Sequence, residues 1–233
     1  MYYKHLNDGE EMKKLLVAAA VTTLIGTVNA QSAFEGAYGQ LGVGYDNNNV
    51  SSSSLLATRS VSTSSTNSSN FAGVIGLGYN FAITKEFLLG VGADYGFMPS
   101  KKFNGDAEFS QAIGYKFSQR YNIFLTSGYV LDKDRLAYLK VGYSSQFLES
   151  TDETSGSATQ GQSTGSGNAN GYVLGLGYKQ MIRSGFYGFG EANYYGYSGA
   201  SFASTTLSEG TRISNFSPKS SAYQFLVGVG YKF

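Results

Sequence analysis

The C-terminal residues 221–233 read SAYQFLVGVGYKF, and this stretch decides the fold class. One face of the stretch carries large apolar residues, namely Tyr223, Phe225, Val227, Val229, Tyr231 and Phe233. The other face carries mostly small or polar residues, namely Ala222, Gln224, Leu226, Gly228, Gly230 and Lys232. An alternation with a period of two residues is the pattern of a β-strand whose two faces meet different surroundings. The stretch therefore predicts a strand.

The Gly-x-Gly-Tyr phrase of this strand recurs along the chain, at residues 42–45, 76–79 and 175–178. No segment after residue 30 shows a sustained helical period of 3.6 residues. Alternating segments lie at about residues 33–46, 70–83, 87–98, 120–131, 136–148, 170–182, 186–198 and 221–233. The chain is therefore predicted to be all-β, with eight strands.

The connections between these strands alternate in length. Short turns are predicted at residues 84–86, 132–135 and 183–185, and long connections at 47–69, 99–119, 149–169 and 199–220. This alternation places every long connection at one end of an antiparallel up-and-down meander. The role of segment 99–119 stays open, because part of it is also compatible with strand extensions beyond a membrane.

The apolar face of each strand is predicted to meet lipid. The opposite face is mostly Gly and small polar residues with scattered charges, which suits the cramped interior of an eight-stranded barrel. The predicted strands are longer than the roughly 9–11 residues that a tilted strand needs to cross a bilayer. Only a closed barrel pairs every backbone group of a sheet in lipid. The sequence therefore predicts an eight-stranded antiparallel up-and-down transmembrane β-barrel.

The N-terminal residues are predicted to be processing signals. Residues 12–30 contain two lysines, an apolar stretch, a glycine breaker and small residues at the end, which is the order of a secretory signal peptide. We expect cleavage between Ala30 and Gln31, which leaves residues 31–233 as the outer-membrane barrel domain. Acidic residues within 1–11 lie directly ahead of Met12 and do not suit a signal peptide. We therefore interpret residues 1–11 as an upstream mis-start of translation, with Met12 as the true first residue.

The composition excludes several classes of function. The chain has no Cys, which removes disulfides and thiol chemistry, and its one histidine, His5, lies in the part predicted to be removed. The Gly-x-Gly triplets lack the third glycine of a dinucleotide-binding loop. A net charge of +1 without a basic run gives no sign of a nucleic-acid partner. We therefore expect no enzyme activity, no cofactor and no metal site.

The predicted signal peptide, the eight strands, the repeated phrase and the terminal residues 229–233 resemble the small outer-membrane β-barrel family of proteobacterial surface proteins. That family includes OmpA-type membrane domains, opacity-type surface antigens and porin-like proteins. The resemblance implies the outer membrane of a Gram-negative bacterium, with its lipid and lipopolysaccharide as surroundings. It also implies that Tyr231 and Phe233 form a C-terminal signal for the barrel-assembly machinery, and it leaves an external ligand or host surface open as a partner.

The inward face is predicted to carry a network of charges. Strand parity points six charged residues into the lumen: Asp94, Arg120, Lys140, Lys179, Glu191 and Lys232. Charges in a narrow lumen need partners, and Glu191 is predicted to be the hub for the three lysines.

Two functions are compatible with this interior. One is a structural or surface-interaction barrel with a plugged polar lumen and mobile, extracellular loops rich in Ser, Gly and Asn. The other is a small-solute or ion channel with a weak preference for anions. Side chains fill the lumen of an eight-stranded barrel, which favours the plug.

Overall fold

The computed structural model describes residues 32–51, 53–56, 59–62, 66–98, 103–104, 113–152, 163–198, 205–206, 212–213 and 219–233. All of these residues belong to one compact unit, Ser32–Phe233. The predicted signal peptide, its cleavage site and the upstream mis-start lie outside the described residues. Within the described ranges, no helix has the length and apolar character that a membrane-crossing helix needs.

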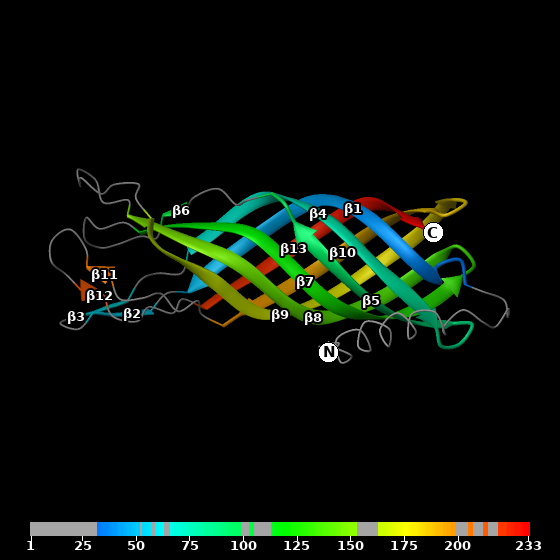
Figure 1. Cartoon of the computed structure of the whole chain (residues 1–233), viewed down its shortest axis with the longest axis horizontal. Helices are drawn as coiled ribbons and strands as arrows, with labels where there is room; N and C mark the ends of the chain where they lie inside the picture. Colours follow the sequence, from blue (N-terminus) through cyan, green and yellow to red (C-terminus); the bar gives the residue numbers. More distant parts are fainter. Residues whose placement is uncertain are drawn as a thin grey trace, which may run out of the picture. The chain divides into compact units, whose positions relative to one another are not determined.

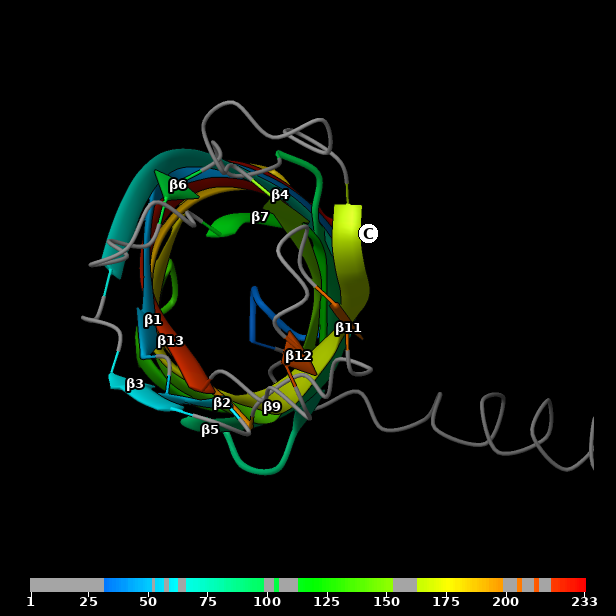
Figure 2. The same ribbon diagram turned by 90° about the vertical axis from the view of Figure 1, so that its left-hand side faces the viewer.

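Eight long antiparallel strands form the body of the molecule (Figure 1). They are β1 (Gly36–Ser51), β4 (Thr66–Ala82), β5 (Phe87–Gly96), β7 (Ile113–Asp132), β8 (Arg135–Asp152), β9 (Ser163–Arg183), β10 (Phe186–Tyr197) and β13 (Lys219–Lys232). Each long strand pairs with the next one along the chain, and β13 pairs with β1, which closes the ring (Figure 2). The prediction of an eight-stranded up-and-down barrel is confirmed.

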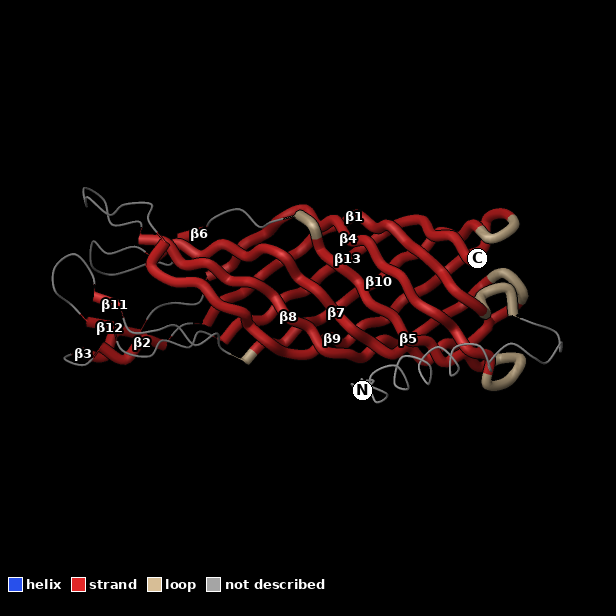
Figure 3. The backbone as a smooth tube through the Cα atoms, viewed as in Figure 1, coloured by secondary structure: helices blue, strands red, loops and turns tan. Residues whose placement is uncertain are grey.

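The two ends of the barrel differ. Three short turns, at residues 83–86, 133–134 and 184–185, lie at the end that also holds the C-terminus, which we call the turn end (Figure 3). In one of these turns, a hydrogen bond from the Arg135 guanidinium lowers the pKa of the Asp132 carboxyl. The opposite end, which we call the loop end, holds the long connections.

At the loop end, several strands run further than the apolar alternation predicted. β1 continues to Ser51, and β7 already begins at Ile113, so part of the segment 99–119 extends a strand. Polar side chains form cross-strand hydrogen bonds in these extensions, for example from Asn49 to Asn67 at 2.6 Å. Such pairs stabilise a ladder without apolar residues, and for this reason hydropathy alone missed these residues.

The long connections also contain short strands that the sequence pattern did not predict. β2 (Ser53–Leu56), β3 (Arg59–Ser62), β11 (Thr205–Thr206) and β12 (Arg212–Ile213) form a separate four-stranded sheet. β6 (Phe103–Asn104) pairs with the first residues of β7. The first and last long connections are therefore partly joined to each other by backbone pairing between β12 and β2.

The outward face of the barrel is an apolar belt between aromatic residues. Exposed Leu, Val and Ile side chains occupy the middle of the strands. Toward the loop end, the register pairs outward aromatic residues on neighbouring strands, namely Tyr45 with Phe71, Tyr95 with Tyr121, Tyr143 with Tyr172 and Tyr194 with Tyr223. Toward the turn end, a second level consists of Phe87, Tyr129, Phe186, Tyr231 and Phe233. An apolar belt between two aromatic girdles is the exterior of a membrane barrel.

Glycines on the inward face make room for aromatic rings of the neighbouring strand. Tyr138 lies opposite Gly177 in the ladder between β8 and β9, and a Cβ atom on Gly177 would collide with its ring. Gly230 accommodates the ring of Tyr187 in the same way. The repeated glycines therefore allow bulky rings to fill a narrow lumen.

Candidate functional site

The centre of the lumen holds a buried layer of ion pairs. Lys140 on β8 lies 2.7 Å from Asp94 on β5 and 2.9 Å from Glu191 on β10. β5 and β10 are four places apart in the ring of eight strands, so the two carboxylates come from opposite walls. All three side chains are buried, and Lys140 is only 2% exposed. A single lysine thus ties opposite sides of the barrel together. We call Asp94, Lys140 and Glu191 the central layer.

Hydrogen bonds satisfy the two carboxylates further. The Tyr138 hydroxyl donates to Glu191 at 2.5 Å, and the Asn193 amide donates to the other Glu191 oxygen at 2.8 Å. The Asn122 amide donates to Asp94. The Lys140 ammonium also lies 4.1 Å from the centre of the Phe124 ring. Buried ion pairs need this degree of hydrogen bonding to offset the loss of water.

A second cluster surrounds Arg120, nearer the loop end. Its guanidinium lies 3.1 Å from the Asp46 carboxylate and donates to Asn48 at 2.9 Å and to Gln146 at 3.3 Å. The ring of Tyr195 lies 4.2 Å from the guanidinium. Arg120 was predicted to face the lumen, but Asp46 was not. The residue before Asp46 is an outward-facing tyrosine, so strand parity also points Asp46 inward.

Lys179 does not join the central layer, although it was predicted to meet Glu191. Its ammonium lies over three tyrosine rings, 3.8 Å from the centre of Tyr38, 4.9 Å from Tyr187 and 5.3 Å from Tyr138. The rings that the inward glycines accommodate therefore surround this lysine by cation–π contacts. Among the ion pairs of the described residues, Lys140 is the one lysine partner of Glu191.

Lys232 lies apart from these clusters. It is only partly buried at the turn end, where its side chain passes close to Gly36. Of the six charged residues predicted to face the lumen, the structure brings together Asp94, Lys140 and Glu191. Among the described residues, Lys140 rather than Glu191 is the hub, because it is the lysine that contacts both acids.

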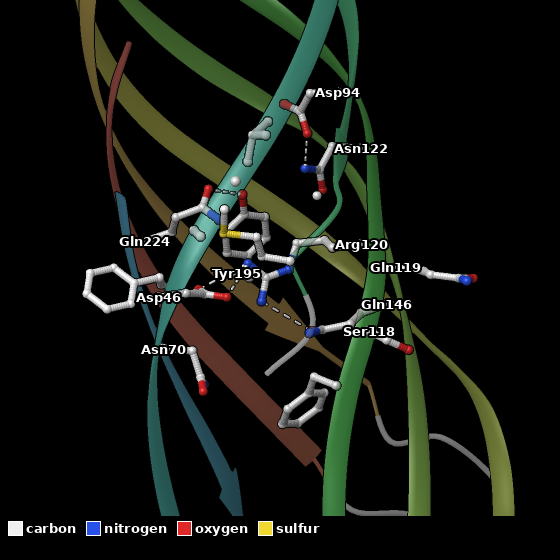
Figure 4. Close-up of a pocket in the computed structure, with 17 residues that line it drawn as sticks. Asp46, Asn70, Asp94, Ser118, Gln119, Arg120, Asn122, Gln146, Tyr195 and Gln224 are labelled. Atoms are coloured by element: carbon white, nitrogen blue, oxygen red, sulfur yellow. Dashed lines mark hydrogen bonds and ion pairs between the residues drawn. The ribbon is translucent and has the colours of Figure 1, made fainter. Parts of the chain in front are cut away.

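A pocket lies beside the Arg120 cluster (Figure 4). Its walls include the polar side chains of Asp46, Arg120, Asn122 and Gln146 and the apolar side chains of Phe71, Ala72, Val74, Met98 and Phe117. In the described part of the chain, no group of three His, Cys, Asp or Glu residues is arranged to hold a metal ion.

Comparison with known proteins identifies the family. A family model described as the outer membrane protein beta-barrel domain matches residues 16–233. The chain belongs to this family. The family match confirms the resemblance inferred from the repeated strands, and it assigns the protein to the bacterial outer membrane, with membrane lipid around its apolar belt. A search of the curated proteins found no match.

Several solved structures are similar to this chain. One is the attachment invasion locus protein Ail of Yersinia pestis, at 14% identity and a TM-score of 0.46, with coverage of 85% of this chain and 99% of that chain. Another is OprG from Pseudomonas aeruginosa, at 14% identity and a TM-score of 0.48, with coverage of 87% of this chain and 99% of that chain. A third is the outer membrane protease OmpT from Escherichia coli, at 9% identity and a TM-score of 0.49, with coverage of 89% of this chain and 100% of that chain.

Proposed function

We propose that this outer-membrane barrel has a structural or surface-interaction role and that its lumen is closed by a polar plug. One observation carries the proposal: Lys140 contacts carboxylates from opposite walls at 2.7 and 2.9 Å, at the centre of the lumen. Breaking such a buried pair leaves charges without partners, which is costly. The central layer therefore favours one rigid arrangement over an open water path.

The alternative, a small-solute or ion channel with a weak anion preference, has less support. The anion preference rested on an excess of basic residues in the lumen. Asp46 adds a third inward acid to Asp94 and Glu191, which balances the three buried cations Arg120, Lys140 and Lys179. A balanced lumen has little electrostatic reason to select anions.

Catalysis is not part of the proposal. From residue 31 onward the chain contains no His and no Cys, which are the most common proton-transfer and thiol groups of hydrolases. The acids and bases of the central layer are paired with one another and buried, so they are poorly placed to meet a substrate.

Conductance across a planar lipid bilayer tests the plug. We expect the purified wild-type barrel to give no steady ion current above that of the bare membrane. A triple variant, Asp94→Ser, Lys140→Ser and Glu191→Ser, removes the central layer and should conduct, whereas Lys133→Ser in an exposed turn should not. Steady, anion-preferring current through the wild-type protein would refute the plug and support the channel. This wild-type measurement decides the matter even if the triple variant does not fold.

We also propose an orientation and a route to the membrane. Residues 12–30 direct export, cleavage follows Ala30, and Tyr231 and Phe233 guide assembly by the barrel-assembly machinery. The loop end then faces outward, where its connections meet an external ligand or host surface. A peptide tag inserted within 155–167 should be labelled on intact cells, and a tag at 132–135 should not. Labelling in the reverse pattern would overturn this orientation.

A further inference from the structure

Phe34, two residues ahead of β1, is buried in the turn end of the lumen. It is 2% exposed and belongs to one apolar cluster with the second residues of three strands that follow short turns, namely Leu88 of β5, Leu136 of β8 and Tyr187 of β10. The Phe34 and Tyr187 rings pack edge to face, with their centres 6.4 Å apart. Figure 2 shows the chain just ahead of β1, in the darkest blue, within the outline of the ring. An aromatic ring therefore fills this end of the lumen.

A side chain of the barrel wall holds the backbone at Phe34. The Asn80 amide, on β4, donates to the Phe34 carbonyl oxygen at 2.8 Å. Asn80 is itself buried and lies against Gly90 of β5, where a Cβ atom would collide with it. A buried amide without a partner is costly, so this hydrogen bond favours the docked position of Phe34.

Residues 32–35 form a turn of their own and belong to no strand, and we call them the entry segment. The N–H of Glu35 donates to the Ser32 carbonyl oxygen at 3.0 Å, and the N–H of Phe34 donates to the Ser32 hydroxyl at 3.3 Å. The pairing of β1 with β4 begins at Gly36, whose φ of 116° is a left-handed conformation that glycine adopts without strain. The entry segment can therefore leave the lumen about Gly36 without breaking a strand ladder.

The entry segment separates a buried lysine from the water at the turn end. The Tyr187 ring contacts the Phe34 ring, and the Lys179 ammonium lies 4.9 Å from its centre. Lys179 is 4% exposed and is surrounded by cation–π contacts with three tyrosine rings. Such contacts replace the hydration of an ammonium only in part. Departure of the Phe34 ring would therefore hydrate this part of the lumen.

We propose that the entry segment is a stopper that closes the turn end of the lumen. Phe34 seals this end while it is docked, and the segment swings out about Gly36 while the strand ladders stay intact. The central layer is carried by the strands themselves, so the lumen has one movable seal and one fixed seal. Current through the triple variant that lacks the central layer then flows in the intervals in which the stopper is out. The inference concerns the turn end and does not depend on whether the central layer blocks ions.

Cysteine labelling tests the stopper, because the chain has no Cys and one introduced thiol is the sole reporter. Thr126→Cys places this thiol on the inward face of β7, where Thr126 is 9% exposed and lies with Asn80 against Gly90. Thr126 is four residues nearer the turn end than Asn122, which contacts Asp94 of the central layer. The rate of reaction with iodoacetamide, in barrels refolded in detergent micelles, then reports how often the turn end opens.

Phe34→Ala in this background should raise the rate about 10- to 100-fold, because the burial of one phenylalanine side chain no longer holds the segment in place. Phe34→Leu restores most of the apolar bulk and should react much more slowly than Phe34→Ala. The matched control is Leu148→Ala, which deletes a buried apolar side chain at the loop end and should leave the rate unchanged. An unchanged rate in Phe34→Ala, or an equal rise in Leu148→Ala, would overturn the stopper, with folding of each barrel checked by its unheated gel mobility.

A second variant tests the hydrogen bond to the stopper. Asn80→Ala should raise the rate about two- to tenfold, as expected for the loss of one buried hydrogen bond. The factor should be smaller in the Phe34→Ala background, because the carbonyl oxygen is then no longer held within reach of the amide. The same factor in both backgrounds would show that Asn80 acts on the barrel wall alone, and would overturn its role in holding the stopper.

Discussion

Substitution of Lys140 by Met is the sharpest probe of the lumen, because in the described part of the chain this lysine is the one group that contacts both acids of the central layer. Methionine has a similar length and keeps apolar contact with the Phe124 ring, so little empty space should result. The variant removes the ammonium that lies 2.7 Å from Asp94 and 2.9 Å from Glu191. Two buried carboxylates from opposite walls would then face each other without their cation.

The magnitude follows from the burial of the pair. Removal of one partner of a buried ion pair costs about 3–5 kcal/mol, because the other charge stays buried and uncompensated. The hydrogen bonds from Tyr138, Asn193 and Asn122 remain and reduce this cost, whereas the presence of two acids increases it. We therefore expect Lys140→Met to lower the free energy of unfolding by about 3–5 kcal/mol.

Urea unfolding of the barrel in lipid vesicles measures this change, provided that folding and unfolding curves coincide. The matched control is Lys133→Met, because Lys133 is 89% exposed and lies 3.8 Å from Asp134. An exposed pair of this kind contributes about 0–1 kcal/mol. If the two variants lost the same small amount, the lumen would be hydrated enough to solvate the carboxylates, and the reasoning that leads to a dry plug would be refuted.

Three further outcomes are expected from the same unfolding assay. Glu191→Gln should destabilise the barrel by about 2–3 kcal/mol, less than Lys140→Met, because the lysine keeps its second carboxylate; a loss below about 1 kcal/mol would contradict this. Gly177→Ala should cost about 1–3 kcal/mol because its Cβ would meet a tyrosine ring, whereas Gly190→Ala, with nothing nearer than 4.0 Å, should be almost neutral. Val227→Arg should cost about 2–4 kcal/mol if the residue lies near the bilayer midplane, and an unchanged stability would show that this face does not meet lipid.

The limits of the strands show where hydropathy stops being informative. The apolar alternation located all eight long strands, because lipid outside and a crowded lumen inside require opposite residue types on successive positions. It ended too early at the loop end, where polar pairs such as Asn49 with Asn67 continue the ladder. Beyond the lipid, both faces of a strand are polar, so the alternation disappears although the backbone pairing does not.

In the lumen, too, the sequence pattern predicted one part of the arrangement and not another. Parity along each strand was enough to point Asp94, Lys140 and Glu191 inward, because side chains alternate strictly between the two faces. Parity also pointed Lys179 inward, but it carried no information on the tyrosine rings that surround this lysine. Those rings reach it from three different strands, through spaces left by glycines on their neighbours.

The sequence by itself determined the fold class, the strand count, the outward face and the set of inward charges, since each of these depends on the local order of residues. Only the tertiary structure decided which of those charges meet. Lys140 lies 46 residues from Asp94 and 51 from Glu191. Ring closure and strand register set these contacts, because they fix the height of each side chain in the lumen.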